Sequence, residues 1–311
     1  MTARPSPDHR PSWSGTAAHP LTVTALAAPA PRAGRLRAAL RSRRLRIGLG
    51  VLAVLVLTAL LGPLFLGDPN EIGPDLTRSP SAAHWLGTTQ TGQDVFAQFV
   101  VATRGTLLIG GAAALVATAV SVVVGIGGGF AGGLTDEALS LLSNVFLVVP
   151  GLPLVIVVAA YVGAGTASTI LVIALTTWAA SARVLRAQTL SLRTRDYVLA
   201  ARLYGESRRR IVLVEILPNE LAIIVSQFIF AVIFAVLTQA SLAFLGLDDP
   251  ANLTWGTMLY FAQNAEALAG GSWWWFVPPG LAIAVLGAAL SLISFGLDEI
   301  LDPRLRARRP R

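Results

Sequence analysis

Residues 106–130 read TLLIGGAAALVATAVSVVVGIGGGF, a run without a charged side chain. As a helix with a rise of about 1.5 Å per residue, this run is longer than the ~30 Å hydrocarbon core of a bilayer. An apolar run of this length without interruption is typical of a transmembrane helix rather than of a helix in a soluble core. The segment therefore predicts a membrane span, from which the rest of the chain can be placed.

Further segments pass the same test, namely residues 47–66, 139–162, 168–182, 221–245 and 276–297. None has an arginine at its centre, where such a charge costs at least ~2.5 kcal/mol. Of the 311 residues, 54% are hydrophobic and only 13% are charged, whereas soluble domains carry about 25% charge. The sequence predicts an all-α membrane protein with six transmembrane helices and a cytoplasmic loop between the fourth and fifth.

The arginines are distributed unevenly between the connections. Clusters lie before the first predicted span, after the fourth and after the sixth, while the loop after the first span holds only Arg78 and Arg104. By the positive-inside rule, both termini are predicted to be cytoplasmic in a multi-pass protein of the plasma (inner) membrane. The turn near Asp136 has no arginine, although this topology places it inside. The net charge of +7 thus fits membrane orientation better than nucleic-acid binding.

This pattern divides the chain into four parts. Residues 1–46 are rich in Pro, Ala, Arg and Ser, and they are predicted to form a disordered basic tail. Residues 47–105 hold the first span and an outside loop. Residues 106–300 form a core of five spans, which includes the cytoplasmic loop 193–220. Residues 301–311 are a basic cytoplasmic tail.

Small and helix-breaking residues predict how the spans pack. Glycines four residues apart allow helix backbones to approach closely, and they occur as Gly125/Gly129, Gly128/Gly132 and Gly129/Gly133. The close approach is either within the chain or to a partner subunit. Pro150 and Pro153 lie inside the third predicted span, where each removes a backbone hydrogen bond and predicts a kink.

Uncharged polar side chains inside spans are candidates to line a solute path, because polar groups are costly in lipid. They are Asn144, Gln227, Thr238, Gln239 and Ser241. The alternative is that each bonds across helices without a role in transport.

Catalysis finds no support in the sequence. The chain has no Cys and only three scattered His, so a typical zinc site is not expected. The G-x-S-x-G elbow, the H-E-x-x-H helix and the GxxxxGK[ST] phosphate loop are all absent from it. We therefore predict no catalytic residue, no metal site and no cofactor.

The cytoplasmic loop has a helical pattern of its own. Spacings of three and four residues predict one face of a short helix, formed by Tyr197, Ala200, Ala201 and Tyr204. Gly205 suits the left-handed end of that helix, Ser207 can cap a second short helix, and Pro218 is expected to stop it. Arg208–Arg210 open the second helix, where the dipole disfavours cations. They serve either a contact with anionic lipid or an acidic partner, or orientation by charge alone.

This loop resembles the EAA loop of ABC-importer permeases at Tyr197, Ala200, Ala201, Gly205, Ile211, Leu217, Pro218 and Asn219. Other segments resemble the C-type permeases of the dipeptide, oligopeptide and nickel group, at residues 84–88, 244–247, 273–274, 279–282 and 301–305. Leu199 departs from the usual Glu of that loop, and Glu215 stands where His is common.

The resemblance implies a non-enzymatic permease subunit of an ATP-driven importer for a peptide-like or nickel-type solute. Its implied partners are a homologous permease, two cytoplasmic ATPases, an extracytoplasmic solute-binding protein and the lipid bilayer. The residues implied to couple to the ATPase are Tyr197, Ala200, Ala201, Gly205, Ile211, Leu217 and Pro218. The alternatives are a structural scaffold and a self-sufficient secondary transporter. The transporter would need an ionisable residue or broken helices at mid-membrane, and no Asp, Glu or His lies at the centre of a predicted span.

Overall fold

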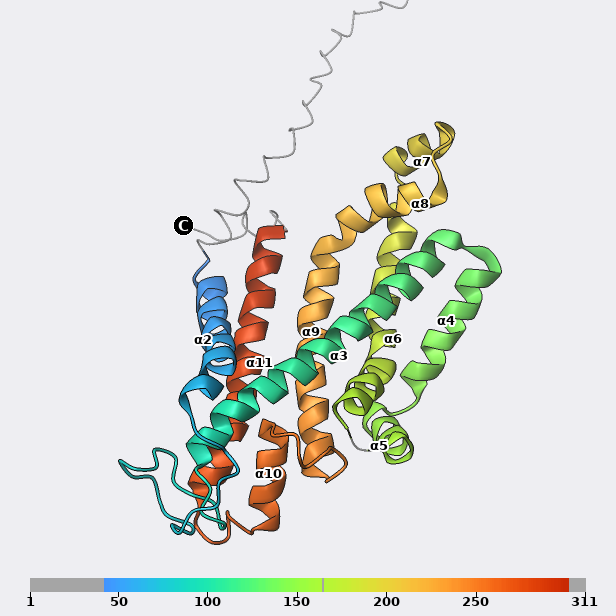
Figure 1. The fold of residues 1–311 in the computed structure, drawn as a ribbon. Helices are drawn as coiled ribbons and strands as arrows, with labels where there is room; N and C mark the ends of the chain where they lie inside the picture. Colours follow the sequence, from blue (N-terminus) through green and yellow to red (C-terminus); the bar gives the residue numbers. More distant parts are fainter. Residues whose placement is uncertain (1–41, 164, 302–311) are drawn as a thin grey trace, which may run out of the picture.

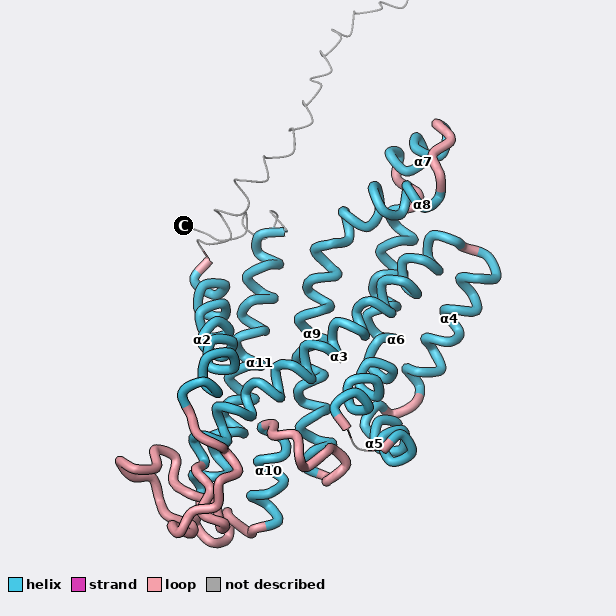
Figure 2. Tube along the Cα trace, viewed as in Figure 1, coloured by secondary structure: helices cyan, strands magenta, loops and turns pink. Residues whose placement is uncertain are grey.

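A computed structural model describes residues 42–163 and 165–301, and within these ranges every regular element is a helix (Figure 2). Five helices are long and apolar enough to cross a membrane: α2 (Arg43–Phe65), α3 (Val95–Ala131), α6 (Thr166–Leu192), the helix Arg208–Phe244 that ends in α9 (Leu217–Phe244), and α11 (Trp273–Leu301). The predicted all-α membrane fold is confirmed. Most of the predicted N-terminal tail and nearly all of the C-terminal tail lie outside the described residues.

The predicted third span is not one helix. It is divided into α4 (Gly133–Val148) and α5 (Gly151–Val162), whose axes differ by 93°. The break has a local cause, because a residue before proline avoids the helical region, and Val149 is extended with ψ 128°. Pro153 falls in the first turn of α5, where a missing N–H costs no intrahelical bond. The predicted kink is therefore a sharp break at Pro150 alone.

The two ends of the bundle carry different connections (Figure 1). At one end lie the start of α2, the turn between α3 and α4, α7 (Asp196–Leu203), α8 (Arg208–Arg210) and the end of α11. At the other end lie residues 66–94, the connection from α5 to α6, and α10 (Trp255–Asn264). We call these the elbow end and the loop end. The arginine-rich connections among the described residues gather at the elbow end, in agreement with the predicted alternation.

Two spans are longer than their apolar runs suggested. α3 has 37 residues and crosses the bundle obliquely (Figure 1). It starts at Val95 because the Asp94 carboxylate accepts the N–H groups of Phe96 and Ala97, at 2.7 and 3.1 Å. α6 has 27 residues, and it continues through the arginines that ended the predicted span at residue 182.

Glycines set the distance between α3 and α6. A Cβ atom on Gly125 would lie 2.5 Å from the Ala182 carbonyl oxygen, and one on Gly129 would lie 3.1 Å from Thr189 Cβ. Gly127, on another side of α3, has no atom within 4 Å of such a Cβ. Of the two alternatives for this glycine spacing, close approach within the chain therefore holds for Gly125 and Gly129.

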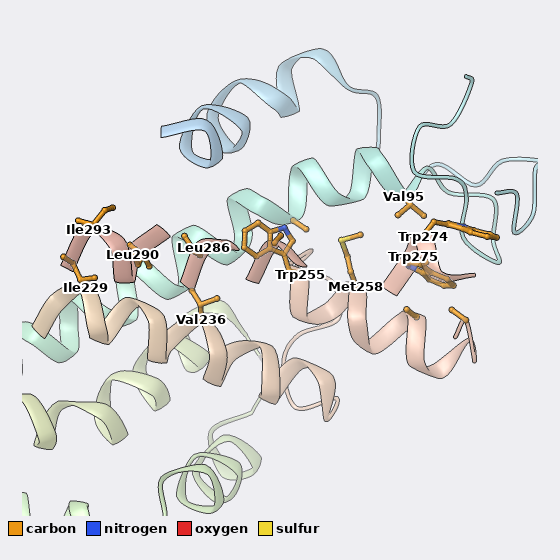
Figure 3. Packing of buried hydrophobic residues seen from close by; sticks show 14 of the residues in the cluster. Val95, Ile229, Val236, Trp255, Met258, Trp274, Trp275, Leu286, Leu290 and Ile293 are labelled. Atoms are coloured by element: carbon orange, nitrogen blue, oxygen red, sulfur yellow. The ribbon is translucent and has the colours of Figure 1, made fainter. Parts of the chain in front are cut away.

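The largest cluster of buried apolar side chains lies between α3, α9, α10 and α11 (Figure 3). Trp255 at the start of α10 is fully buried, and its ring stacks on that of Phe99 with centroids 6.1 Å apart. Thr254 and Thr257 cap α10 reciprocally through their hydroxyl groups. This segment lies in the connection between the predicted spans 221–245 and 276–297, for which no helix was predicted. The structure corrects it to a helix that is fixed in the core.

Candidate functional site

A helix–turn–helix elbow (residues 196–210) projects from the elbow end (Figure 1). Gly205 has φ of +78° and ends α7. The N–H of Glu206 donates to the Ala201 carbonyl at 3.1 Å, and the N–H of Gly205 donates to that of Arg202 at 3.0 Å. This pair of bonds is the Schellman arrangement that a left-handed glycine permits. The predicted left-handed turn is confirmed.

The second half of the elbow differs from its prediction. Ser207 caps α8 as expected, with its hydroxyl accepting the Arg210 N–H at 3.4 Å. The helix then continues through a π-helical stretch, Ile211–Ile216, into α9, so Pro218 does not stop it. Proline leaves a carbonyl without its usual donor. Pro218 stands in the first turn of α9, directly after the π turn in which the Leu217 N–H donates to the Val212 carbonyl, and the Asn219 side-chain amide donates to the Glu215 carbonyl at 2.6 Å.

The predicted coupling residues on α7 lie at the surface of the elbow. Tyr197 is 38% exposed, and Ala200 and Ala201 are half-buried. Burial raises the pKa of the Tyr197 phenol, so its hydroxyl group stays protonated at neutral pH. A small cavity of about 170 Å³ beside them is lined by Ala201, Tyr204, Glu206, Arg210, Ile211 and Glu215.

The remaining coupling residues divide between surface and interior. Ile211 is 2% exposed, Leu217 is half-buried among apolar side chains below the elbow, and Pro218 is exposed. The most exposed apolar side chains of the elbow are Leu203 at 89% and Tyr204 at 88%. Sequence reasoning did not include Leu203. It is the last residue of α7, two positions before Gly205, and that position was the available signal.

Cationic side chains hold the elbow against the end of α3. The Arg202 guanidinium lies 5.1 Å from the centroid of the Phe130 ring, a distance at which cation and ring attract. Arg193 donates to the Gly129 carbonyl at 2.9 Å. Below them, the Thr189 hydroxyl donates to the buried Glu220 carboxylate at 2.7 Å. A displacement of the elbow would therefore act on α3 and α6 as well as on α9.

The arginine-poor turn between α3 and α4 receives its positive charge from α6. Arg186 pairs with Asp136 through two nitrogen–oxygen contacts, one of them 2.9 Å long, and Arg193 reaches the last turn of α3. This arrangement explains how a turn without its own arginine lies at the elbow end.

A cavity of about 430 Å³ lies between the α4–α5 bend, α6 and α9. Three of the residues predicted to line a solute path, Gln227, Thr238 and Ser241, line this cavity. Ser181 donates to the Gln227 amide oxygen at 3.0 Å. The other lining residues are Leu147, Gly151, Leu152, Val155, Thr176, Thr177, Ala180, Phe230, Ala231, Phe234 and Leu237. The lining is mainly apolar and contains no Asp, Glu, Lys, Arg or His.

Two predicted path residues lie elsewhere. Gln239 is fully buried and donates to Asp248 at 2.8 Å and to Thr254 at 2.9 Å. Thr169 completes this network with a 2.8 Å bond to Asp248, so Gln239 ties helices together at the loop end. Asn144 lines a separate cavity and accepts a hydrogen bond from Arg183. Within the described ranges, no group of three His, Cys, Asp or Glu side chains is placed to hold a metal ion.

Comparison with known proteins gives one family. The family described as "Binding-protein-dependent transport system inner membrane component" matches residues 121–307. The oligopeptide transport system permease protein OppC of Bacillus subtilis is 33% identical over 272 residues, which cover 86% of this chain and 88% of that protein. The dipeptide transport system permease protein DppC of the same species is 32% identical over 263 residues, covering 83% and 81%. A putative peptide permease protein of Brucella suis is 33% identical over 282 residues, covering 89% and 93%.

Proposed function

The chain belongs to the family of binding-protein-dependent transport system inner membrane components, and from this membership we propose that it is one permease subunit of an ATP-driven peptide importer. The observation that carries the proposal is the family match over residues 121–307. That range contains the elbow and every helix that lines the uncharged cavity. The names of the similar permeases, which refer to oligopeptides and dipeptides, support a peptide as the solute.

The subunit works with a homologous permease, two ATPases and an external solute-binding protein. The elbow is the part that docks on an ATPase. Its tip presents Leu203 and Tyr204, both almost fully exposed, and exposed apolar side chains of this kind mark interaction surfaces. The elbow end is cytoplasmic in this proposal, because the arginine-rich connections lie there.

One continuous helix joins the elbow to the wall of the cavity, and it provides the path by which the ATPase is coupled to the solute path. The helix Arg208–Phe244 starts in the elbow, and it carries Gln227, Phe230 and Phe234 on the wall of the cavity. A helix transmits a displacement of one end to the other because its backbone is hydrogen-bonded throughout. Closure of the ATPases would thus move the cavity wall, which changes access to the solute path by shifting the population of two states.

The secondary transporter is not supported. The break between α4 and α5 is one of the two features that such a protein uses, but the other, an ionisable group in the path for the coupling ion, is absent from the lining of the cavity. The family, moreover, is described as depending on a binding protein.

Substitution at the tip of the elbow tests the proposal. Leu203→Asp places a charge on the docking surface, and Leu268→Asp places the same charge on a 63% exposed leucine at the loop end. We expect Leu203→Asp, but not Leu268→Asp, to lose the ATPase on purification of the assembled complex. Equal retention of the ATPase by both variants would contradict the docking role.

A further inference from the structure

Three arginines of α6 form a column that contacts α4 and the end of α3. Arg183, Arg186 and Arg193 are three and seven residues apart, which places them on one side of a helix. They contact Asn144 and Asp136 of α4 and the backbone of α3, respectively. Arg183 is three residues from Ala180 and seven from Thr176, which line the solute cavity, so the two cavities are neighbours along α6.

The charge of this column is only partly neutralised. Arg186 forms an ion pair with Asp136. Arg183 is exposed, and its hydrogen bond goes to the neutral amide of Asn144. Among residues 42–163 and 165–297, whose side chains the structure describes, no carboxylate lies within ion-pair distance of Arg183. A cation at membrane depth without a counter-ion is costly, so a negative group from outside the chain would stabilise it.

Arg183 borders a cavity of suitable chemistry. The cavity measures about 220 Å³ and is lined by Val124, Gly125, Leu139, Ser140, Ser143, Asn144, Ala182, Arg183 and Arg186. Two guanidinium groups, two hydroxyl groups and an amide supply several donors. Guanidinium donors match the oxygens of a phosphate group in both charge and spacing.

The depth of Arg183 matches the headgroups of the leaflet at the elbow end. It lies 17 residues after Thr166, the first residue of α6, which corresponds to about 26 Å along the helix. The hydrocarbon core is ~30 Å thick, so a span that begins at Thr166 places Arg183 near the membrane boundary at the elbow end, where its long side chain reaches the headgroup level. Beside the cavity, Leu141 and Val145 of α4 are 65% and 54% exposed and provide an apolar surface for acyl chains.

We propose that the cavity between α4 and α6 binds the phosphate group of an anionic phospholipid from the leaflet at the elbow end, with Arg183 as its main ligand. The acyl chains lie along Leu141 and Val145. A solute carboxylate is the other source of a suitable oxyanion. No arginine lines the solute cavity, and competition with peptide in the test below distinguishes the two sources. The proposal depends on membrane insertion and not on the transport reaction.

The test measures lipid retention and needs no transport activity. The full chain is assembled with its partner subunits in nanodiscs of phosphatidylcholine with a minor fraction of phosphatidylglycerol. Native mass spectrometry then counts the lipids that remain on the complex. We expect Arg183→Gln to bind phosphatidylglycerol about tenfold more weakly, the effect of one lost charge-assisted bond. Arg183→Lys keeps the charge and should retain most of the binding.

Arg195→Gln is the matched control, because it removes an equal charge from the exposed loop after α6. It should bind phosphatidylglycerol like the wild type. If Arg183→Gln fails to assemble, Asn144→Leu reduces the cavity without removing an arginine and should also weaken binding. Three results would overturn the proposal: unchanged retention in Arg183→Gln or Asn144→Leu, equal retention of phosphatidylcholine, or displacement of the lipid by peptide.

Discussion

Gly205→Val is the substitution that isolates the turn of the elbow from the rest of the protein. Gly205 has φ of +78°, where a residue with a Cβ atom costs roughly 1–2 kcal/mol and a β-branched one costs more. No heavy atom lies within 4 Å of a Cβ built at this position, so the side chain itself meets no obstacle. The entire cost is therefore conformational, and it acts on the angle between α7 and α8.

This cost is small for the whole protein and large for docking. Membrane insertion depends on the long apolar helices, which the substitution does not touch. When the native turn becomes less favourable than the other conformations of the elbow by about 1.4 kcal/mol, a complex that requires that turn is weakened about tenfold. We expect Gly205→Val to reach normal levels in the membrane, to bind the ATPase about tenfold more weakly, and to lose substrate-stimulated ATP hydrolysis.

Gly271 provides the control for backbone strain. Its φ is +77° and it also has open space around a Cβ atom, but it lies at the loop end between α10 and α11. Gly271→Val introduces the same local strain far from the elbow. The assay is co-purification of the ATPase, followed by stimulated turnover of the assembled complex. If both valine variants behave alike in this assay, the turn at Gly205 has no special part in coupling.

Three further predictions concern packing and topology. Gly125→Ala should lower the thermal stability of the detergent-solubilised protein, because the added Cβ meets the backbone of α6, whereas Gly127→Ala, which meets open space, should leave it unchanged or raise it. Asp136→Asn should lower the free energy of unfolding by about 1–3 kcal/mol, because Arg186 keeps its charge without a partner. In chemical denaturation, the double variant with Arg186→Gln should lose less free energy of unfolding than the sum of the losses in the two single variants. A reporter fused after Arg311 should be active only in the cytoplasm, and activity outside the cell would contradict the orientation.

Features that depend on neighbouring residues could be predicted from the sequence. The left-handed turn at Gly205 and the cap at Ser207 follow from local backbone chemistry, and the structure has both. The number of long apolar segments was also accessible, because hydropathy reports length directly. Hydropathy does not report direction, however. The run 139–162 is apolar on both sides of Pro150, so Pro150 predicted a kink there, but the size of the 93° bend between α4 and α5 could not be read from it.

Features that depend on distant residues could not be predicted. Gln239 has the same local surroundings as a path-lining residue, and only its partner Asp248, itself bound by Thr169 from 79 residues away, reveals its structural role. α10 was missed for a different reason. Its cap uses Thr257 instead of the usual Glu or Gln at the third position, and its 10 residues are too few for a hydropathy signal. Pro218 was expected to end a helix, but it lies at the start of α9 directly after the π-helical stretch, and local pattern does not show that register.

The π-helical stretch between the elbow and α9 has a consequence for how such permeases can vary in length. In a regular helix, inserting one residue between the elbow and Gln227 would rotate the cavity wall by about 100° relative to the docking surface. A π turn accommodates one surplus residue, and Ile211–Ile216 is the place where this segment already does so. After deletion of one residue there, the stretch can relax to a regular α-helix, and the docking surface and the cavity wall keep their relative orientation. Chimaeras that graft a foreign elbow onto this chain should therefore be joined within this stretch.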